Sequence, residues 1–88
     1  MSNIEPTIEP TIEQIIEAIG DQASESRDGE SVIVGYGPIG YLRLHPDSII
    51  RDGEELPAVR IDGKLSRANG AKQSELREQI RTAGLEIR

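Results

Sequence analysis

Residues 32–40 read VIVGYGPIG, and residues 41–46 continue as YLRLHP. Val32, Ile33 and Val34 are β-formers, and in residues 41–45 Leu42 and Leu44 alternate with Tyr41, Arg43 and His45, which is the period of a β-strand and not of a helix. A helix that began after Gly40 would be broken by Pro46 shortly after it started, because proline lacks the N–H that the helix needs. We therefore predict that residues 35–40 connect two antiparallel strands.

The same nine residues match G-x-G-x-x-G and resemble the first strand and turn of NAD-binding Rossmann domains. That resemblance implies a long helix from the second glycine, with its N-terminus facing the phosphates of the cofactor. The alternating run 41–45 does not supply such a helix. A chain of 88 residues with two helical segments also lacks room for several parallel strands and their crossover helices. We predict a hairpin loop and no NAD, FAD or other cofactor.

Helical periodicity flanks this strand region on both sides. Thr11 and Gln14 have capping-box spacing, which predicts a helix start near Thr11 and an end between Gly20 and Ser24. A second helix is predicted from Asn69 or Gly70, with Gly84 as the left-handed residue that ends it. The apolar stripes of the two helices contain Ile12, Ile15, Ile16, Ile19 and Ala23 in the first, and Leu76, Ile80 and Ala83 in the second. We expect Ile16 and Ile80 to be core residues.

Turn and proline positions divide the middle of the chain into strands. Asp52-Gly53 and Asp62-Gly63 are each the pair that favours a two-residue hairpin turn. Pro46 and Pro57 are expected at strand ends or edges, since neither can donate to a ladder. Residues 25–30 are predicted as loop. The resulting fold class is α+β: an N-terminal helix, an antiparallel meander of three to five short strands, and a C-terminal helix with a short last strand over 85–88. A small SH3-like or other open barrel with flanking helices is the alternative.

Size and composition indicate one small cytoplasmic domain. The chain has 35% apolar and 2% aromatic residues and no cysteine, so its core is small and it has neither disulfides nor thiolate ligands. No apolar run is long enough to span a membrane, and the first residues do not resemble a signal peptide. Because such a core leaves much surface exposed, we expect a homodimer or higher oligomer.

The net negative charge is concentrated in the first part of the chain. Residues 1–46 contain two basic and eight acidic residues, a net charge of 2 − 8 = −6, whereas residues 47–88 contain eight of each. Residues 1–10 repeat Ile-Glu-Pro-Thr and are predicted to be a flexible acidic lead to a single domain over 11–88. The acidity indicates either a solvated surface or a surface for a basic protein partner. Candidate partner-binding residues are Ile4, Ile8, Glu9 and Glu13.

A basic segment over 64–72 is the best candidate for a small-ligand site. Its cations surround a Ser/Asn/Gly stretch at the predicted start of the second helix, where free N–H groups favour an anion. The alternative is an exposed basic loop that caps the helix. The chain has few aromatic residues for base stacking and is acidic overall, so nucleic acid is not expected. The candidate ligand-binding residues are Lys64, Arg67, Asn69, Gly70 and Lys72.

No catalytic or metal site is predicted. His45 is the single histidine, and its neighbours Asp47 and Ser48 are adjacent only in sequence. One histidine without cysteine does not give zinc spacing, and adjacent carboxylates such as Glu54-Glu55 point to opposite faces of a strand. Two functional hypotheses remain: a non-enzymatic regulatory or adaptor protein that binds another macromolecule, or a sensor of a small phosphate-bearing or nucleotide ligand through 64–72.

Overall fold

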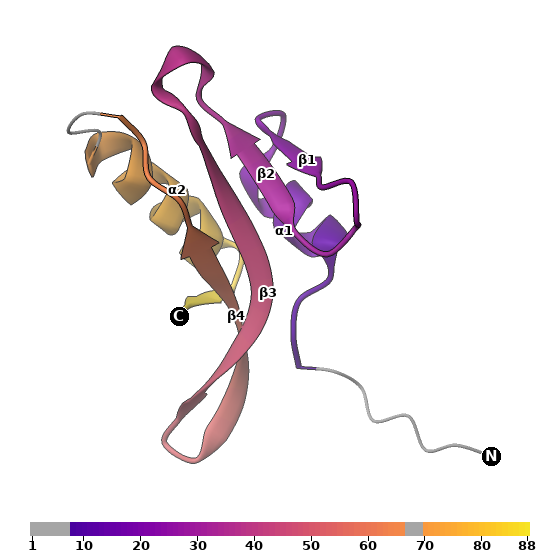
Figure 1. Cartoon of the computed structure of the whole chain (residues 1–88). Helices are drawn as coiled ribbons and strands as arrows, with labels where there is room; N and C mark the ends of the chain where they lie inside the picture. The colour runs from indigo at the N-terminus through magenta and orange to yellow at the C-terminus, as the bar shows by residue number, and fades with distance from the viewer. Residues whose placement is uncertain (1–7, 67–69) are drawn as a thin grey trace.

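Two helices cover one face of a five-stranded sheet (Figure 1). The computed structural model describes residues 8–66 and 70–88. The strands follow the order β1-β2-β3-β4-β5; the first four are antiparallel to their neighbours, and β5 runs parallel to β4. The elements are α1 (Ile12–Ile19), β1 (Ala23–Glu25), β2 (Val32–Gly35), the 3-10 turn η1 (Gly37–Ile39), β3 (Tyr41–Arg51), β4 (Glu54–Asp62), α2 (Gly70–Thr82) and β5 (Glu86–Ile87).

This arrangement confirms the α+β class and the predicted order of elements. Two details differ from the sequence prediction: β3 and β4 are long, with 11 and 9 residues, and the last strand is parallel. The sheet formed by the described residues is open, with β1 at one edge and β5 at the other, and does not close into a barrel.

The glycine-rich stretch is a hairpin connection, as predicted. β2 pairs antiparallel with the start of β3, and the Tyr36 N–H donates to the Gly40 carbonyl across the turn at 2.9 Å. Gly40 has φ 119° and ψ −161°, a conformation open essentially to glycine alone. A Cβ added there would lie 3.6 Å from the Lys64 carbonyl oxygen, so the turn also packs against the chain that follows β4. The glycines serve backbone geometry here.

The core lies between the helices and the sheet. Ile80 is fully buried, whereas Ile16 is half-buried and packs against the core from its margin. Gln79 Nε2 of α2 donates to the Ile19 carbonyl of α1 at 3.2 Å, which joins the two helices. The buried cluster consists of Ile15 and Ile19, Val32 and Val34, Leu42 and Leu44, Val59, Leu65, Leu76 and Ile80, and Leu85.

The start of α1 and the end of α2 are as the sequence predicts, whereas α1 ends at Ile19, just before the predicted range of Gly20 to Ser24. The Thr11 hydroxyl accepts from the Gln14 N–H at 3.1 Å, and the Gln14 side chain accepts from the Thr11 N–H at 2.7 Å. At the end of α2 the Leu85 N–H donates to the Ile80 carbonyl and the Gly84 N–H to the Arg81 carbonyl, which is a Schellman ending. One assignment was wrong: Ala23 belongs to β1, since α1 ends at Ile19 before Gly20.

Strand β1 was missed because residues 25–30 were predicted as loop, although they contain the pair Asp28-Gly29, in which Gly29 has φ 71°. The buried Ser26 hydroxyl donates to Asp28 Oδ1 at 2.6 Å and accepts from the Ser31 N–H at 3.1 Å. Hydrogen bonds from Ser26 and from the Glu30 N–H hold the pKa of Asp28 below its ordinary value of 3.8. Residues 25–30 are therefore not all loop, since Glu25 ends β1.

The two Asp-Gly pairs that the sequence analysis assigned to hairpin turns behave differently. Asp52 and Gly53 have φ values of 54° and 79° and form the tight turn between β3 and β4, as predicted. The prediction for Asp62-Gly63 was wrong: β4 ends at Asp62, and residues 63–66 form no strand. Those residues cross the β2–β3 turn instead, where the Ser66 N–H donates to the Ile39 carbonyl at 2.8 Å.

The two prolines lie inside long strands and not at their ends. Pro46 is in β3 and Pro57 in β4. β2 pairs with β3 only as far as Leu44, and β5 pairs with β4 only at Ala58 and Val59. Each proline thus sits where its strand has a single neighbour, so its missing N–H removes no ladder bond on the open side. The expectation of an edge position was correct for this reason.

Candidate functional site

A hairpin arm, formed by residues 48–57 of β3 and β4, projects from the body of the molecule (Figure 1). Neither β2 nor β5 pairs with this part of the sheet. The helices do not cover its end, and the principal extents of the structure are 49 × 32 × 18 Å. The arm is a two-stranded ribbon whose two faces are open toward its tip.

The arm combines apolar side chains with net negative charge. Ile50 is 76% exposed, the largest exposure recorded for a large apolar residue in residues 8–66 and 70–88. Ile50 lies opposite Glu55 on the helix side of the sheet, whereas Ile49 and Leu56 lie opposite each other on the outer face. Arg51, Asp52, Glu54 and Glu55 give the arm a charge of 1 − 3 = −2. An acidic rim around an exposed apolar side chain favours a basic partner.

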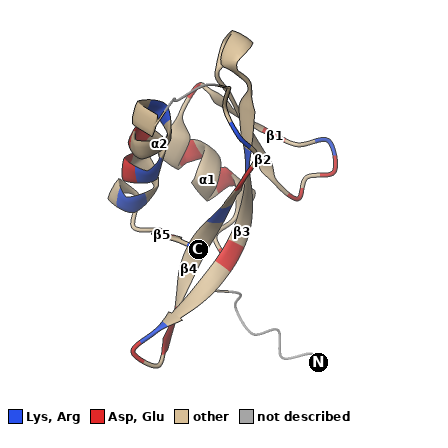
Figure 2. Ribbon diagram, turned by 60° about the vertical axis from the view of Figure 1, so that its left-hand side comes forward, with Lys and Arg blue, Asp and Glu red and all other residues tan. Residues whose placement is uncertain are grey.

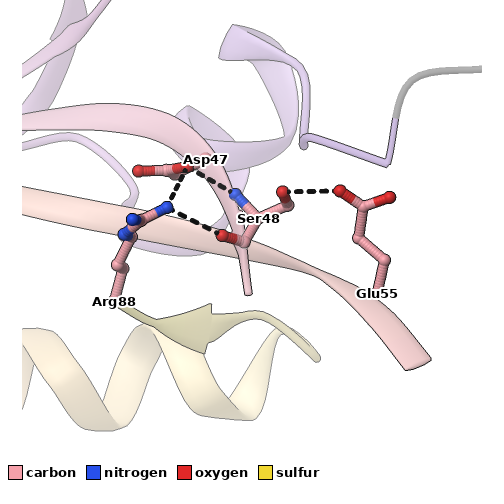
Figure 3. Close-up of polar contacts among 4 residues, drawn as sticks. All are labelled: Asp47, Ser48, Glu55 and Arg88. Atoms are coloured by element: carbon pink, nitrogen blue, oxygen red, sulfur yellow. Dashed lines mark hydrogen bonds and ion pairs between the residues drawn. The ribbon is translucent and has the colours of Figure 1, made fainter. Parts of the chain in front are cut away.

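Side chains form hydrogen bonds with both the backbone N–H and the backbone carbonyl of Ser48, at the base of the arm (Figure 3). Its N–H donates to Asp47 Oδ1 at 2.8 Å, and its carbonyl accepts from Arg88 Nη1 at 3.2 Å. Arg88 Nη1 is also 3.1 Å from Asp47 Oδ1, and the Ser48 hydroxyl donates to Glu55 at 2.9 Å. Because these groups are already bonded, addition of a foreign strand along this edge of β3 would first have to displace them. The arm is thus suited to contacts made by side chains.

Two ion pairs tie the arm to the end of the chain. Arg51 Nη2 of β3 is 2.7 Å from Glu86 Oε1 of β5. In the second pair the cation is at the end of the chain: Arg88 Nη1 is 3.1 Å from Asp47 Oδ1 of β3. All four side chains are partly exposed, so water screens both pairs and each contributes little to stability. Their effect is to restrict where the arm lies relative to β5.

We expect Asp47 to make stability depend on acid pH. Its bond from the Ser48 N–H, and secondarily Arg88, hold the pKa of the Asp47 carboxyl below 3.8 in the folded chain. The ionised carboxylate therefore stabilises the fold above pH 3.8, and this contribution is lost as pH falls through the lowered pKa. In urea titrations, the midpoint concentration should fall less for Asp47→Asn than for the wild type when the pH is lowered from 5 to 2. Identical pH profiles for the two proteins would contradict this role.

The end of the acidic lead meets the base of the arm. Glu9, Pro10 and Pro46 are among the residues that line one shallow hollow, together with Glu30. Pro10 is buried, while Ile8, just before this hollow, is 40% exposed. We call Ile8, Glu9, Pro46, Ile50 and Glu55 the arm surface. Of the sequence-predicted partner residues, Glu9 lines the same hollow as Pro46, two residues before the arm, and Ile8 directly precedes Glu9.

The other sequence-predicted partner residues are not part of the arm surface. Glu13 is exposed in the first turn of α1. Ile4 lies outside the described residues. Sequence reasoning missed Ile50, because a β-branched residue beside a hairpin turn is normally assigned to a core face. Only its position beyond β2 and the helices leaves it exposed.

The predicted ligand segment 64–72 is described only in part. Lys64 is exposed after β4, Gly70 begins α2, and Lys72 is exposed on that helix. Arg67 and Asn69 lie outside the described residues, so their grouping with Lys64 and Lys72 stays a prediction. Lys64 also lines a hollow formed with the outer face of the sheet.

Charges are mixed on the helices and on the sheet (Figure 2). In residues 8–66 and 70–88 no three His, Cys, Asp or Glu side chains are grouped as metal ligands would be. Within the same ranges, no helix is long and apolar enough to cross a membrane. Comparison with known protein families, with curated proteins and with solved structures gave no match. The functional argument therefore depends on the geometry of this chain.

Proposed function

We propose that this chain is a small non-enzymatic regulatory or adaptor protein that acts by binding another protein, in the cytoplasm, through the arm surface. The observation that carries the proposal is the exposure of Ile50 on a projecting arm with acidic neighbours. An exposed β-branched side chain of this kind is an anchor that a pocket can desolvate at low entropic cost. Glu55 opposite Ile50, together with Asp52 and Glu54 at the turn, favours a partner with basic residues around that pocket.

The test compares two exposed apolar positions at opposite ends of the molecule. Wild type, Ile50→Ser and Tyr41→Ser are used as bait in quantitative affinity capture, and the protein captured by the wild type is then purified and titrated by calorimetry. We expect Ile50→Ser to weaken that purified complex about tenfold or more, because anchor residues carry most of the binding energy. Tyr41→Ser, also at an exposed apolar residue (56%), should leave the complex unchanged.

Two results would decide against the arm. If Ile50→Ser and the wild type bind the purified partner equally, the arm is not the docking element. If both serine variants weaken it equally, the effect is not specific to the arm. Light scattering of the wild type and of Ile50→Ser also tests the proposed self-association: a dimer that Ile50→Ser dissociates would identify the partner as a second copy of this chain.

A further inference from the structure

A second hollow lies on the outer face of the sheet, away from the arm tip. It is lined by Gly40, Tyr41, Arg43, Asp62, Gly63 and Lys64. Leu42 and Leu44 point into the core, so Tyr41 and Arg43 alternate onto the outer face. Arg43 is paired in register with Asp62 on β4. The sheet register thus brings the start of β3 and the end of β4 together around this hollow.

Two glycines, Gly40 and Gly63, are among the residues that line this hollow. A Cβ on Gly63 would lie 3.3 Å from the Tyr41 carbonyl oxygen, and one on Gly40 would lie 3.6 Å from that of Lys64. The two chain segments therefore touch through positions that have no side chain.

Two cations at this hollow, Arg43 and Lys64, belong to none of the ion pairs found in residues 8–66 and 70–88, although, after the hydrogen bond from Ser26, the charge of Arg43 helps to lower the pKa of Asp28. Asp62 Oδ2 is 3.4 Å from Arg60 Nη1 and 3.5 Å from His45 Nε2, whereas the ion pairs found within these ranges include neither Arg43 nor Lys64. Arg43, Arg60 and Lys64 against Asp62 give a local charge of 3 − 1 = +2, in a chain of net charge −6. A half-buried guanidinium beside an ammonium group favours a phosphate group with several oxygens.

Two other groups can recognise the rest of a phosphate-bearing ligand. Tyr41 is 56% exposed and offers a ring face for stacking. The known contacts of Asp62 are made by Oδ2, and no described residue donates a hydrogen bond to its Oδ1. A free carboxylate oxygen is suited to accept hydrogen bonds from sugar hydroxyls. Cationic, aromatic and acceptor groups around one hollow match the three parts of a mononucleotide.

We propose that this hollow binds a nucleoside monophosphate, with Arg43 and Lys64 on the phosphate, Asp62 on the ribose hydroxyls and Tyr41 against the base. The site shares Lys64 with the segment predicted from sequence but replaces Arg67 and Lys72 by residues of β3. It is independent of the arm surface, so its failure would leave the proposed protein binding untouched.

The experiment titrates the full chain with AMP, adenosine, ribose 5-phosphate and inorganic phosphate, followed by calorimetry and by amide chemical shifts. We expect AMP to bind with a dissociation constant tighter than about 1 mM and to shift the amides of Gly40, Tyr41, Gly63 and Lys64. Loss of the phosphate or of the base, and Arg43→Ala, Lys64→Ala or Tyr41→Leu, should each weaken binding about tenfold or more. Arg77→Ala, at an exposed cation on α2, is the matched control and should bind AMP like the wild type, while Lys72→Ala distinguishes this hollow from the segment 64–72 and should have no effect if AMP binds here.

Four outcomes would overturn the site. The first is that AMP shows no saturable binding to the wild type. The second is that the amide shifts are confined to other parts of the chain. Equal weakening by Arg77→Ala and Arg43→Ala would indicate diffuse attraction by charge. Weakening by Lys72→Ala that matches Lys64→Ala would place the anion at the start of α2 instead. The shift map is measured on the wild type, so it tests the site even if a variant fails to fold.

Discussion

Truncation of Ile80 to alanine is expected to lower the free energy of unfolding by about 2–5 kcal/mol. Ile80 is fully buried in the cluster that joins both helices to the sheet. Its neighbours come from elements that are fixed by their own hydrogen bonds, so the cavity would be only partly refilled. Ile16→Ala should cost less, about 1–2 kcal/mol, because Ile16 is half-buried and water already contacts part of its side chain.

Urea denaturation followed by circular dichroism measures both variants, and the slope of the transition checks that each still unfolds in two states. The comparison is informative because the sequence assigns both residues to the core in the same way. Equal losses would mean that α1 packs more deeply than its exposure indicates. An unchanged midpoint for Ile80→Ala would contradict the core described above.

Replacement of Gly40 by alanine is expected to cost about 1–3 kcal/mol, whereas Gly35→Ala should be neutral or slightly stabilising. The two glycines belong to the same G-x-G-x-x-G match. Gly40 has φ 119°, which strains any residue with a Cβ, and it abuts Lys64 and Leu65. Gly35 lies in β2 with nothing within 4 Å of an added Cβ.

Thermal or urea unfolding of the two variants provides the measurement. If the glycines served to let a cofactor approach the backbone, there would be no reason for Gly40→Ala to lose more stability than Gly35→Ala. A large loss for Gly35→Ala together with tolerance at Gly40 would reject the hairpin explanation of the motif. The expected pattern follows from the backbone alone.

Local signals predicted the elements whose cause is local. The Thr11–Gln14 capping box and the Schellman ending at Gly84 involve residues within one turn of each other, so their chemistry is visible in sequence. The Asp52-Gly53 turn was predicted for the same reason. β1 was missed although its hairpin contains Asp28-Gly29, because the polar run over 25–30 is also typical of a loop and the bonds of Ser26 to Asp28 and Ser31 form only in the fold.

Non-local contacts decided the rest of the fold. Asp62-Gly63 has the same residues as Asp52-Gly53, yet no strand follows it, because the chain there packs against the β2–β3 turn through Ser66 and Ile39. Pro46 and Pro57 are accommodated inside strands because the pairing of β2 with β3 and of β5 with β4 does not extend to them. Neither fact can be read from the neighbours of these residues along the chain.

The candidate sites divide in the same way. From the sequence came the acidic lead end at Ile8 and Glu9 and the cation Lys64, since charge and repeats are properties of composition. Cross-strand register then placed Arg43 beside Asp62, and the short reach of β2 left Ile50 exposed on the arm. By itself the sequence determined which residues alternate and where the chain turns, because those depend on backbone sterics over a few residues. Only the tertiary structure decided which of those residues are in contact, because these contacts depend on how far each neighbouring strand extends along β3 and β4.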